Sequence, residues 1–152
     1  MLTGRCVPAS RWVPVMTSAS AAIRQAAVIA VKAGQVCLVT SSSGKRWVIP
    51  KGCLEPGKTA GEVALQEAWE EAGLVGVLRP EPVGSYLYEK FGNSYHVTVF
   101  LLHVTEAADD WPEQPLRQRC WLTPVQALAR VEDAGLRELI RAALRKRAEP
   151  EA

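Results

Sequence analysis

Residues that bind zinc are scarce in this sequence. Its 152 residues include two histidines, His96 and His103, and four cysteines, none of which stands in a Cys-x-x-Cys pair. Structural zinc sites are usually built from closely spaced cysteines and histidines, so a zinc site has little support. The cysteine spacing also predicts no disulfide framework, which is typical of a reducing cytoplasm. We therefore expect a cytoplasmic protein.

Long hydrophobic runs are also absent. The longest apolar stretches, such as residues 26–31 and 97–102, are far shorter than the roughly 20 residues that a membrane-spanning helix needs. We therefore expect no membrane partner. With 48% hydrophobic and 22% charged residues, the chain is typical of one globular domain with a hydrophobic core.

Acidic residues are missing from the first third of the chain. Every charged residue within 1–54 is Arg or Lys. Scattered basic residues are usually solvated surface, and an anionic ligand is the alternative interpretation. Nucleic-acid binding needs denser basic clusters with interleaved aromatic residues, so no nucleic-acid partner is expected. Residues 1–22 have no periodic apolar face, and we interpret them as a flexible leader ahead of a domain at 23–148.

Strands and helices alternate in an order that predicts an α/β or α+β sandwich. The helix at 59–72 is followed by Gly73, a natural C-terminal stop, and the glycine- and proline-containing stretch 52–57 predicts a loop before it. Two further helices begin near 123 and 133. The expected strands cover residues 23–31, 35–40, 47–49, 83–88, 95–104 and 119–122.

Three glutamates on the first helix are the main candidates for chemistry. Glu67, Glu70 and Glu71 are three and four residues apart, so they lie on one side of the helix. Like charges at this spacing destabilise a helix unless a cation neutralises them. Mg²⁺ prefers carboxylate oxygens and keeps places for water and phosphate, so it suits such a helix. A glutamate-rich stretch alone is more often a solvated helix face than a metal site, and the surrounding sequence decides between these two interpretations.

That surrounding sequence resembles the Nudix box. The box pattern is Gly, five residues, Glu, seven residues, then Arg-Glu-U-x-Glu-Glu-x-Gly-U, where U is aliphatic. This resemblance implies an α/β/α sandwich with a mixed β-sheet and a hydrolase that cleaves diphosphate linkages. The matching residues are Gly52, Glu67, Glu70, Glu71, Gly73 and Leu74.

The resemblance also implies a role for each box residue. Glu67 and Glu71, with the backbone carbonyl of Lys51, would hold Mg²⁺, for which Mn²⁺ could substitute. Glu70 would act as the general base toward the attacking water. Neighbouring carboxylates raise the pKa of such a glutamate and a metal lowers it, so the net direction stays open at this point.

Three positions depart from the box. Lys58 stands in place of glutamate, which removes a peripheral carboxylate and offers a cation for phosphate. Gln66 stands in place of the arginine that orients a box glutamate, and it can give only a neutral hydrogen bond. Ala68 replaces a bulkier aliphatic residue, which alters packing. Because the three glutamates remain, we expect an active enzyme; the alternative is a weakened Nudix-fold sensor or interaction module.

Beyond the box, the chain is similar to the diphosphoinositol polyphosphate and dinucleoside polyphosphate hydrolase branch. The resemblance rests on residues 24–27, 39–50, 104–106, 110–111 and 117–121. It implies a small phosphoanhydride substrate, either a nucleoside or dinucleoside polyphosphate or a diphosphoinositol polyphosphate, cleaved by water attack on phosphorus. Trp47, Tyr86 and Tyr88 are interpreted as core residues rather than base-stacking ones, and the oligomeric state stays open. The residues implied in substrate binding are Arg24, Ser41, Ser42, Ser43 and Arg117, with Lys45 and Lys90 as further candidates.

Overall fold

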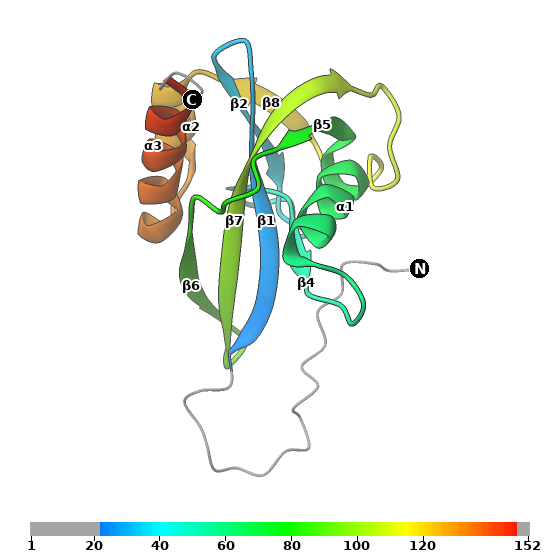
Figure 1. The fold of residues 1–152 in the computed structure, drawn as a ribbon, viewed down its shortest axis with the longest axis vertical. Coiled ribbons are helices and arrows are strands. Elements are labelled where there is room, and N and C mark those ends of the chain that lie inside the picture. Colours follow the sequence, from blue (N-terminus) through cyan, green and yellow to red (C-terminus); the bar gives the residue numbers. More distant parts are fainter. Residues whose placement is uncertain (1–21, 149–152) are drawn as a thin grey trace.

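The computed structural model describes residues 22–148, which form one mixed sheet between two helical layers. Figure 1 shows α1 on one side of the sheet and α2 and α3 on the other. The predicted leader, apart from Ala22, lies outside the described residues. The elements are β1 (Ile23–Lys32), β2 (Gln35–Thr40), β3 (Trp47–Val48), β4 (Lys51–Cys53), α1 (Ala60–Ala72), β5 (Leu74–Leu78), β6 (Gly84–Lys90), β7 (Asn93–Ala107), β8 (Arg119–Leu122), α2 (Pro124–Arg130) and α3 (Ala134–Ala148).

The eight-stranded sheet is built around two long parallel strands. β1 pairs with β7 in parallel, and the main path of the sheet runs β3-β2-β1-β7-β5. β4 joins β1, β6 joins β7 and β8 joins β2, all antiparallel. The predicted α/β/α sandwich with a mixed sheet is therefore confirmed.

The sequence of β1 is almost continuously hydrophobic because both faces of this strand are buried. Ala27 and Ile29 pack toward α2 and α3, whereas Ala26 and Val28 pack toward α1. A strand covered on both faces cannot alternate apolar and polar residues, so its sequence is continuously hydrophobic. The same double burial makes β1 a rigid support for the residues of β4, which pair with it.

Helix α1 has strong local signals at both ends. Thr59 and Glu62 form a reciprocal capping box, and Gly73 ends the helix in the left-handed conformation at φ 68°. Its buried face includes Ala64, Ala68 and Ala72. These small side chains let the helix axis approach the sheet closely, which accounts for Ala68 at a position where the box has a larger residue. The predicted helix is confirmed, with Thr59 as its cap.

Several sequence expectations needed correction. β4 lies where a loop was expected, because its three residues are too short and glycine-containing to show a strand pattern, yet they pair with β1. β5 was also missed; it pairs with β7 through a bulge at Gly76.

Cys53 is disulfide-bonded, which the cysteine spacing did not predict. The cytoplasmic location stays a prediction. Within residues 22–148, no helix is long and apolar enough to cross a membrane.

Candidate active site

The site begins where α1 crosses β4. Glu67 and Glu71 are one turn apart on the buried face of α1, and only 3% and 4% of their surfaces are exposed. The Glu71 Oε1 atom accepts a hydrogen bond from the Lys51 backbone N–H at 3.3 Å. A Cβ atom at Gly52 would lie 2.4 Å from the Glu67 carboxyl group. The box glycine therefore leaves the space in which Glu67 lies against β4.

Arg117 holds Glu71 from the opposite side. Its Nη2 atom lies 3.4 Å from Glu71 Oε2, and its Nε donates to Glu113 at 2.8 Å. Its Nη1 also donates to the Thr40 carbonyl oxygen at 2.9 Å. Contacts with β2 and with the 108–118 loop therefore hold the guanidinium next to Glu71.

Burial makes the carboxylate pair difficult to ionise. Burial, together with the negative charges of Glu71 and Glu70, raises the pKa of Glu67 to about 9. Burial also raises the pKa of Glu71 to about 7, although the positive charges of Arg117 and Lys51 oppose this rise. Burial lowers the pKa of Lys51 to about 8, partly offset by Glu71. Two buried carboxyl groups in contact favour sharing a proton, unless a cation takes its place.

The residues at this crossing fit a hard divalent cation. Glu67 Oε1 and Glu70 Oε1 are both buried and accept no hydrogen bond from the described residues. A buried carboxylate oxygen without a partner is costly, and oxygen donors of this kind are those that Mg²⁺ binds. Within residues 22–148, no set of three or more His, Cys, Asp or Glu side chains is grouped to hold a metal. A metal at this crossing would therefore need oxygen ligands from backbone, water or substrate besides the carboxylates.

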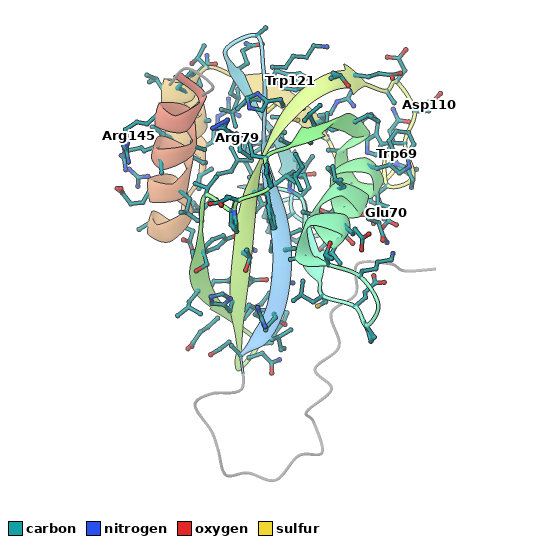
Figure 2. The ribbon with its side chains drawn as sticks, in the orientation of Figure 1. Trp69, Glu70, Arg79, Asp110, Trp121 and Arg145 are labelled. Atoms are coloured by element: carbon teal, nitrogen blue, oxygen red, sulfur yellow. The ribbon has the colours of Figure 1, made fainter. Side chains whose placement is uncertain are left out.

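Glu70 is oriented by Gln66, as the resemblance implies for this position. The Gln66 Nε2 atom donates to Glu70 Oε2 at 3.0 Å. Lys58 Nζ contacts Gln66 Oε1 and lies 3.6 Å from Glu55 Oε1. The Lys58 ammonium group is directed at Gln66, and the expectation that it offers a cation to phosphate stays a prediction. Figure 2 shows Glu70 on the same side of the molecule as Trp69 and Asp110.

The loop after β7 closes the C-terminal end of α1. Trp111 Nε1 donates to the Glu71 carbonyl oxygen at 2.9 Å, and the Glu113 N–H donates to that of Glu70 at 2.9 Å. Arg119 Nη1 donates to the Ala72 carbonyl oxygen at 2.8 Å. These bonds satisfy carbonyl groups that a helix end leaves without partners. They also fix the last turn, which carries two of the three glutamates.

A cleft of about 290 Å³ opens beside Glu71. A second cleft of about 300 Å³ extends from it toward the start of α3. The first is lined by Gln25, Ser41, Ser42, Arg46, Val48, Lys51, Glu71, Tyr88, Lys90, Phe91, Tyr95 and Arg117. The second shares five of these residues, Arg46, Val48, Lys51, Tyr88 and Lys90, and adds Trp47, Tyr86, Glu89, Val131, Glu132, Asp133 and Leu136. The two clefts are therefore adjacent, and together they are called the groove.

The structure brings together most of the predicted binding residues. Ser41, Ser42 and Arg117 line the first cleft, but Arg24 and Ser43 do not. Arg24 is exposed at the start of β1, and side-chain alternation along a strand places it on the face opposite Gln25. Ser43 is exposed, and its Oγ atom lies 3.2 Å from that of the buried Ser41.

Other groove residues were not predicted from sequence. Arg46 and the Lys51 side chain bring positive charge to both clefts, and Gln25 accepts a hydrogen bond from the Tyr88 hydroxyl at 2.8 Å. Tyr88 also stacks on Tyr95 at 4.7 Å between ring centroids. The all-basic first third of the chain was the available signal for Arg46. Nothing local distinguishes a tyrosine that lines a groove from one that fills a core.

Comparison with known proteins identifies the family of this chain. The NUDIX domain family model matches residues 22–143, and the chain belongs to the Nudix family. It is 37% identical over 102 residues to Nudix hydrolase 12, mitochondrial, from Arabidopsis thaliana, covering 62% of this chain and 50% of that protein. It is also 37% identical over 106 residues to human diphosphoinositol polyphosphate phosphohydrolase 3-alpha, covering 66% and 57%. The predicted resemblance to this branch is confirmed.

The chain spans roughly half the length of these curated relatives. Among solved structures, it is similar to a C. elegans Ap4A hydrolase with a TM-score of 0.70 and 21% identity, covering 84% of this chain and 99% of that one. It is also similar to a Nudix hydrolase from Nitrosomonas europaea with a TM-score of 0.68 and 19% identity, covering 85% and 93%. These two likenesses support the fold alone.

Proposed function

We propose that this protein is a divalent-metal-dependent pyrophosphohydrolase that cleaves a diphosphate linkage in a small polyphosphate. One observation carries the proposal: the buried pair Glu67 and Glu71 meets β4 at the edge of a groove that contains Arg117, Arg46 and Lys51. Carboxylates that need a cation, next to basic groups that need an anion, suit a metal-bound phosphate substrate.

The proposed reaction divides the work among the residues of the site. Glu67, Glu71 and the Lys51 carbonyl would hold Mg²⁺, or Mn²⁺ in its place, and the ion would neutralise phosphate charge as the P–O bond breaks. Glu70, held by Gln66, accepts a proton from the water whose oxygen bonds to phosphorus. The electrons of the broken P–O bond leave with the second phosphate. Arg117 and the basic groups of the groove bind the phosphate oxygens.

Within this class, we propose a nucleoside or dinucleoside polyphosphate in preference to a diphosphoinositol polyphosphate. The second cleft is lined by the carboxylates of Glu89, Glu132 and Asp133 as well as by the rings of Tyr86 and Tyr88. An inositol polyphosphate bears phosphates around its whole ring and would direct some of them at these carboxylates. A nucleoside is neutral there and offers N–H and O–H donors and a ring to stack.

A substrate panel with Mg²⁺ tests the activity. Purified protein is incubated with dinucleoside polyphosphates, nucleoside triphosphates, nucleotide sugars and diphosphoinositol polyphosphates, and phosphate release is compared with that of Glu70→Gln. The exposed Glu138→Gln on α3 is the matched control and should behave as the natural chain does. Turnover that exceeds Glu70→Gln by at least about a hundredfold on one substrate is expected. If the natural chain turns over no substrate faster than Glu70→Gln does, the proposed enzymatic activity is refuted. The alternative, a Nudix-fold sensor or interaction module, would then be favoured.

A charge reversal tests the substrate class. Glu132→Lys should raise kcat/KM for diphosphoinositol polyphosphates relative to dinucleoside polyphosphates, because it replaces a repelling carboxylate with a cation. Glu138→Lys makes the same charge change outside the groove. If the ratio of the two kcat/KM values is the same in Glu132→Lys and Glu138→Lys, the acidic end of the groove does not select the substrate.

A further inference from the structure

We infer that Lys58 and Gln66 together position Glu70, with Lys58 supplying the positive charge that the box pattern carries at residue 66. In the box pattern, position 58 is acidic and position 66 is an arginine, whereas this chain has a cation at 58 and a neutral amide at 66. The positive charge that the pattern has at position 66 is therefore supplied in this chain from position 58, so the two departures compensate each other. This inference rests on the proposed function only in the role that it gives Glu70.

The contacts form a line along one side of α1. Lys58 Nζ contacts Gln66 Oε1, and Gln66 Nε2 donates to Glu70 Oε2 at 3.0 Å. Positions 62, 66 and 70 are four residues apart, so they follow one another on the helix surface. Glu62 begins this line, but its Oε1 accepts the Thr59 N–H at 2.9 Å as part of the capping box. The Lys58 ammonium is therefore directed at Gln66 and at Glu55, 3.6 Å away.

Lys58 determines which way the Gln66 amide faces. An amide presents an oxygen at one end and an NH₂ group at the other, and only the NH₂ group can donate to a carboxylate. An ammonium group at the oxygen end fixes the orientation in which NH₂ faces Glu70. It also polarises the amide, which strengthens the N–H donor beyond an ordinary neutral hydrogen bond. Without the ammonium group, the amide is free to turn its oxygen toward Glu70 and repel it.

The orientation matters because Glu70 has one carboxylate oxygen bound and one unbound. Its Oε2 accepts from Gln66, while its Oε1 is buried and accepts no hydrogen bond from residues 22–148. Holding Oε2 fixes the carboxylate and leaves Oε1 without a hydrogen bond from the described residues, and this is the oxygen that would accept the proton in the proposed reaction. Lys58 is thus a positioning residue that acts through Gln66, and it lies outside the residues that line the groove.

Steady-state kinetics with Mg²⁺ and the best substrate of the panel test the inference. Lys58→Met should lower kcat about fivefold with little change in KM, since the charge-assisted bond to the Gln66 amide oxygen is lost. Lys58→Arg should keep most of kcat. Lys32→Met, at the exposed end of β1, is the matched control and should leave both constants unchanged. A rise in KM with kcat unchanged would overturn the inference, because it would mean that Lys58 binds substrate directly.

The double variant Lys58→Glu/Gln66→Arg restores the charges of the box pattern. Lys58→Glu alone should lower kcat more than Lys58→Met does, because it places a carboxylate at the amide oxygen. Adding Gln66→Arg should recover kcat to within about twofold of the natural chain, a rescue that a purely structural defect at residue 58 would not show. Effects that simply add in the double variant would overturn the coupling of the two residues.

A second measurement does not depend on catalysis. The side-chain NH₂ resonances of Gln66, observed by NMR in the metal-free protein, should shift on Lys58→Met and on Glu70→Gln but not on Lys32→Met. If the chemical shifts of the Gln66 NH₂ group are unchanged in Lys58→Met, Lys58 does not orient Gln66, and the inference is overturned even if the enzyme is active. Conversely, a natural chain without turnover would refute the proposed function, while the amide shift would still decide whether Lys58 orients Gln66.

Discussion

At the level of single residues, the close approach of Glu67 to Gly52 accounts for the glycine at position 52. Glu67 lies so close to the β4 backbone that a Cβ atom at residue 52 would be 2.4 Å from its carboxyl carbon and 2.7 Å from its Cγ. Glu67 cannot move away easily, because its helix is fixed against the sheet through Val63, Ala64 and Ala68. The glycine of the box thus has a steric role, which the sequence pattern alone does not reveal.

Gly52→Ala should therefore displace the Glu67 carboxylate and weaken metal binding. We expect kcat/KM to fall at least about tenfold and the Mg²⁺ concentration for half-maximal activity to rise, because a ligand is moved out of place. Gly61→Ala in the first turn of α1 is the matched control, since its Cβ would meet Leu78 Cδ2 at 3.3 Å and Thr59 Oγ1 at 4.0 Å and would not approach Glu67. Metal titrations of the two variants make the comparison. Equal Mg²⁺ requirements in both would show that the close approach at Gly52 has no role.

At the level of elements, α1 depends on the loop that follows β7. Trp111 packs over Gly73 and donates to the Glu71 carbonyl oxygen, while the Arg119 guanidinium lies 4.2 Å from the centre of the Trp111 ring. The Asp110-Trp111 pair contributed to the resemblance without an assigned role. Its role is now clear: the loop closes the helix end and sets the position of the glutamates.

Trp111→Phe tests this connection. The change keeps an aromatic ring over Gly73 but removes the N–H donor, so we expect the free energy of unfolding to fall by about 1 kcal/mol. A domain of this size should then lose about 2–4 °C in Tm. Trp69→Phe, on the partly exposed face of α1, provides the comparison. A Tm loss that is no greater in Trp111→Phe than in Trp69→Phe would mean that the indole bond contributes nothing to the helix end.

At the level of the whole molecule, the buried carboxylates make stability depend on pH. The folded-state pKa values of Glu67 and Glu71, about 9 and about 7, lie above their usual value of 4.5. The folded protein therefore keeps protons that the unfolded chain releases, so the contribution of these two groups to stability is largest below the unfolded value of 4.5 and is lost as pH rises from there through their folded-state values. Lys51, lowered from 10.5 to about 8, acts in the opposite direction only above about pH 8.

Thermal unfolding of the metal-free protein should show this trend. Between the usual glutamate pKa of 4.5 and about pH 8, Tm should fall as pH rises, and Glu67→Gln should reduce the slope. Mg²⁺ should raise Tm more at the upper end of this range than at the lower end, because its ligands must be deprotonated. A Tm that stays level or rises with pH would contradict the burial of an uncompensated carboxylate pair.

Much of the fold was predictable because its signals are local. The capping box of Thr59 and Glu62, the stop at Gly73 and the apolar run of β1 are all visible within a few residues of sequence. β4 and β5 were missed because their pairing with β1 and β7 depends on residues distant in the chain. The disulfide of Cys53 was missed because cysteine spacing does not give distance in space.

The sequence by itself determined that Glu67, Glu70 and Glu71 share one helix, and that Gln66 replaces the expected arginine, because helical spacing and residue identity are properties of the chain alone. The tertiary structure decided which glutamates are buried, that Lys58 is directed at Gln66, and that Arg24 lies away from the groove while Arg46 lines it. Burial, pKa and the lining of a groove depend on atoms from several elements, and only folding brings those atoms together.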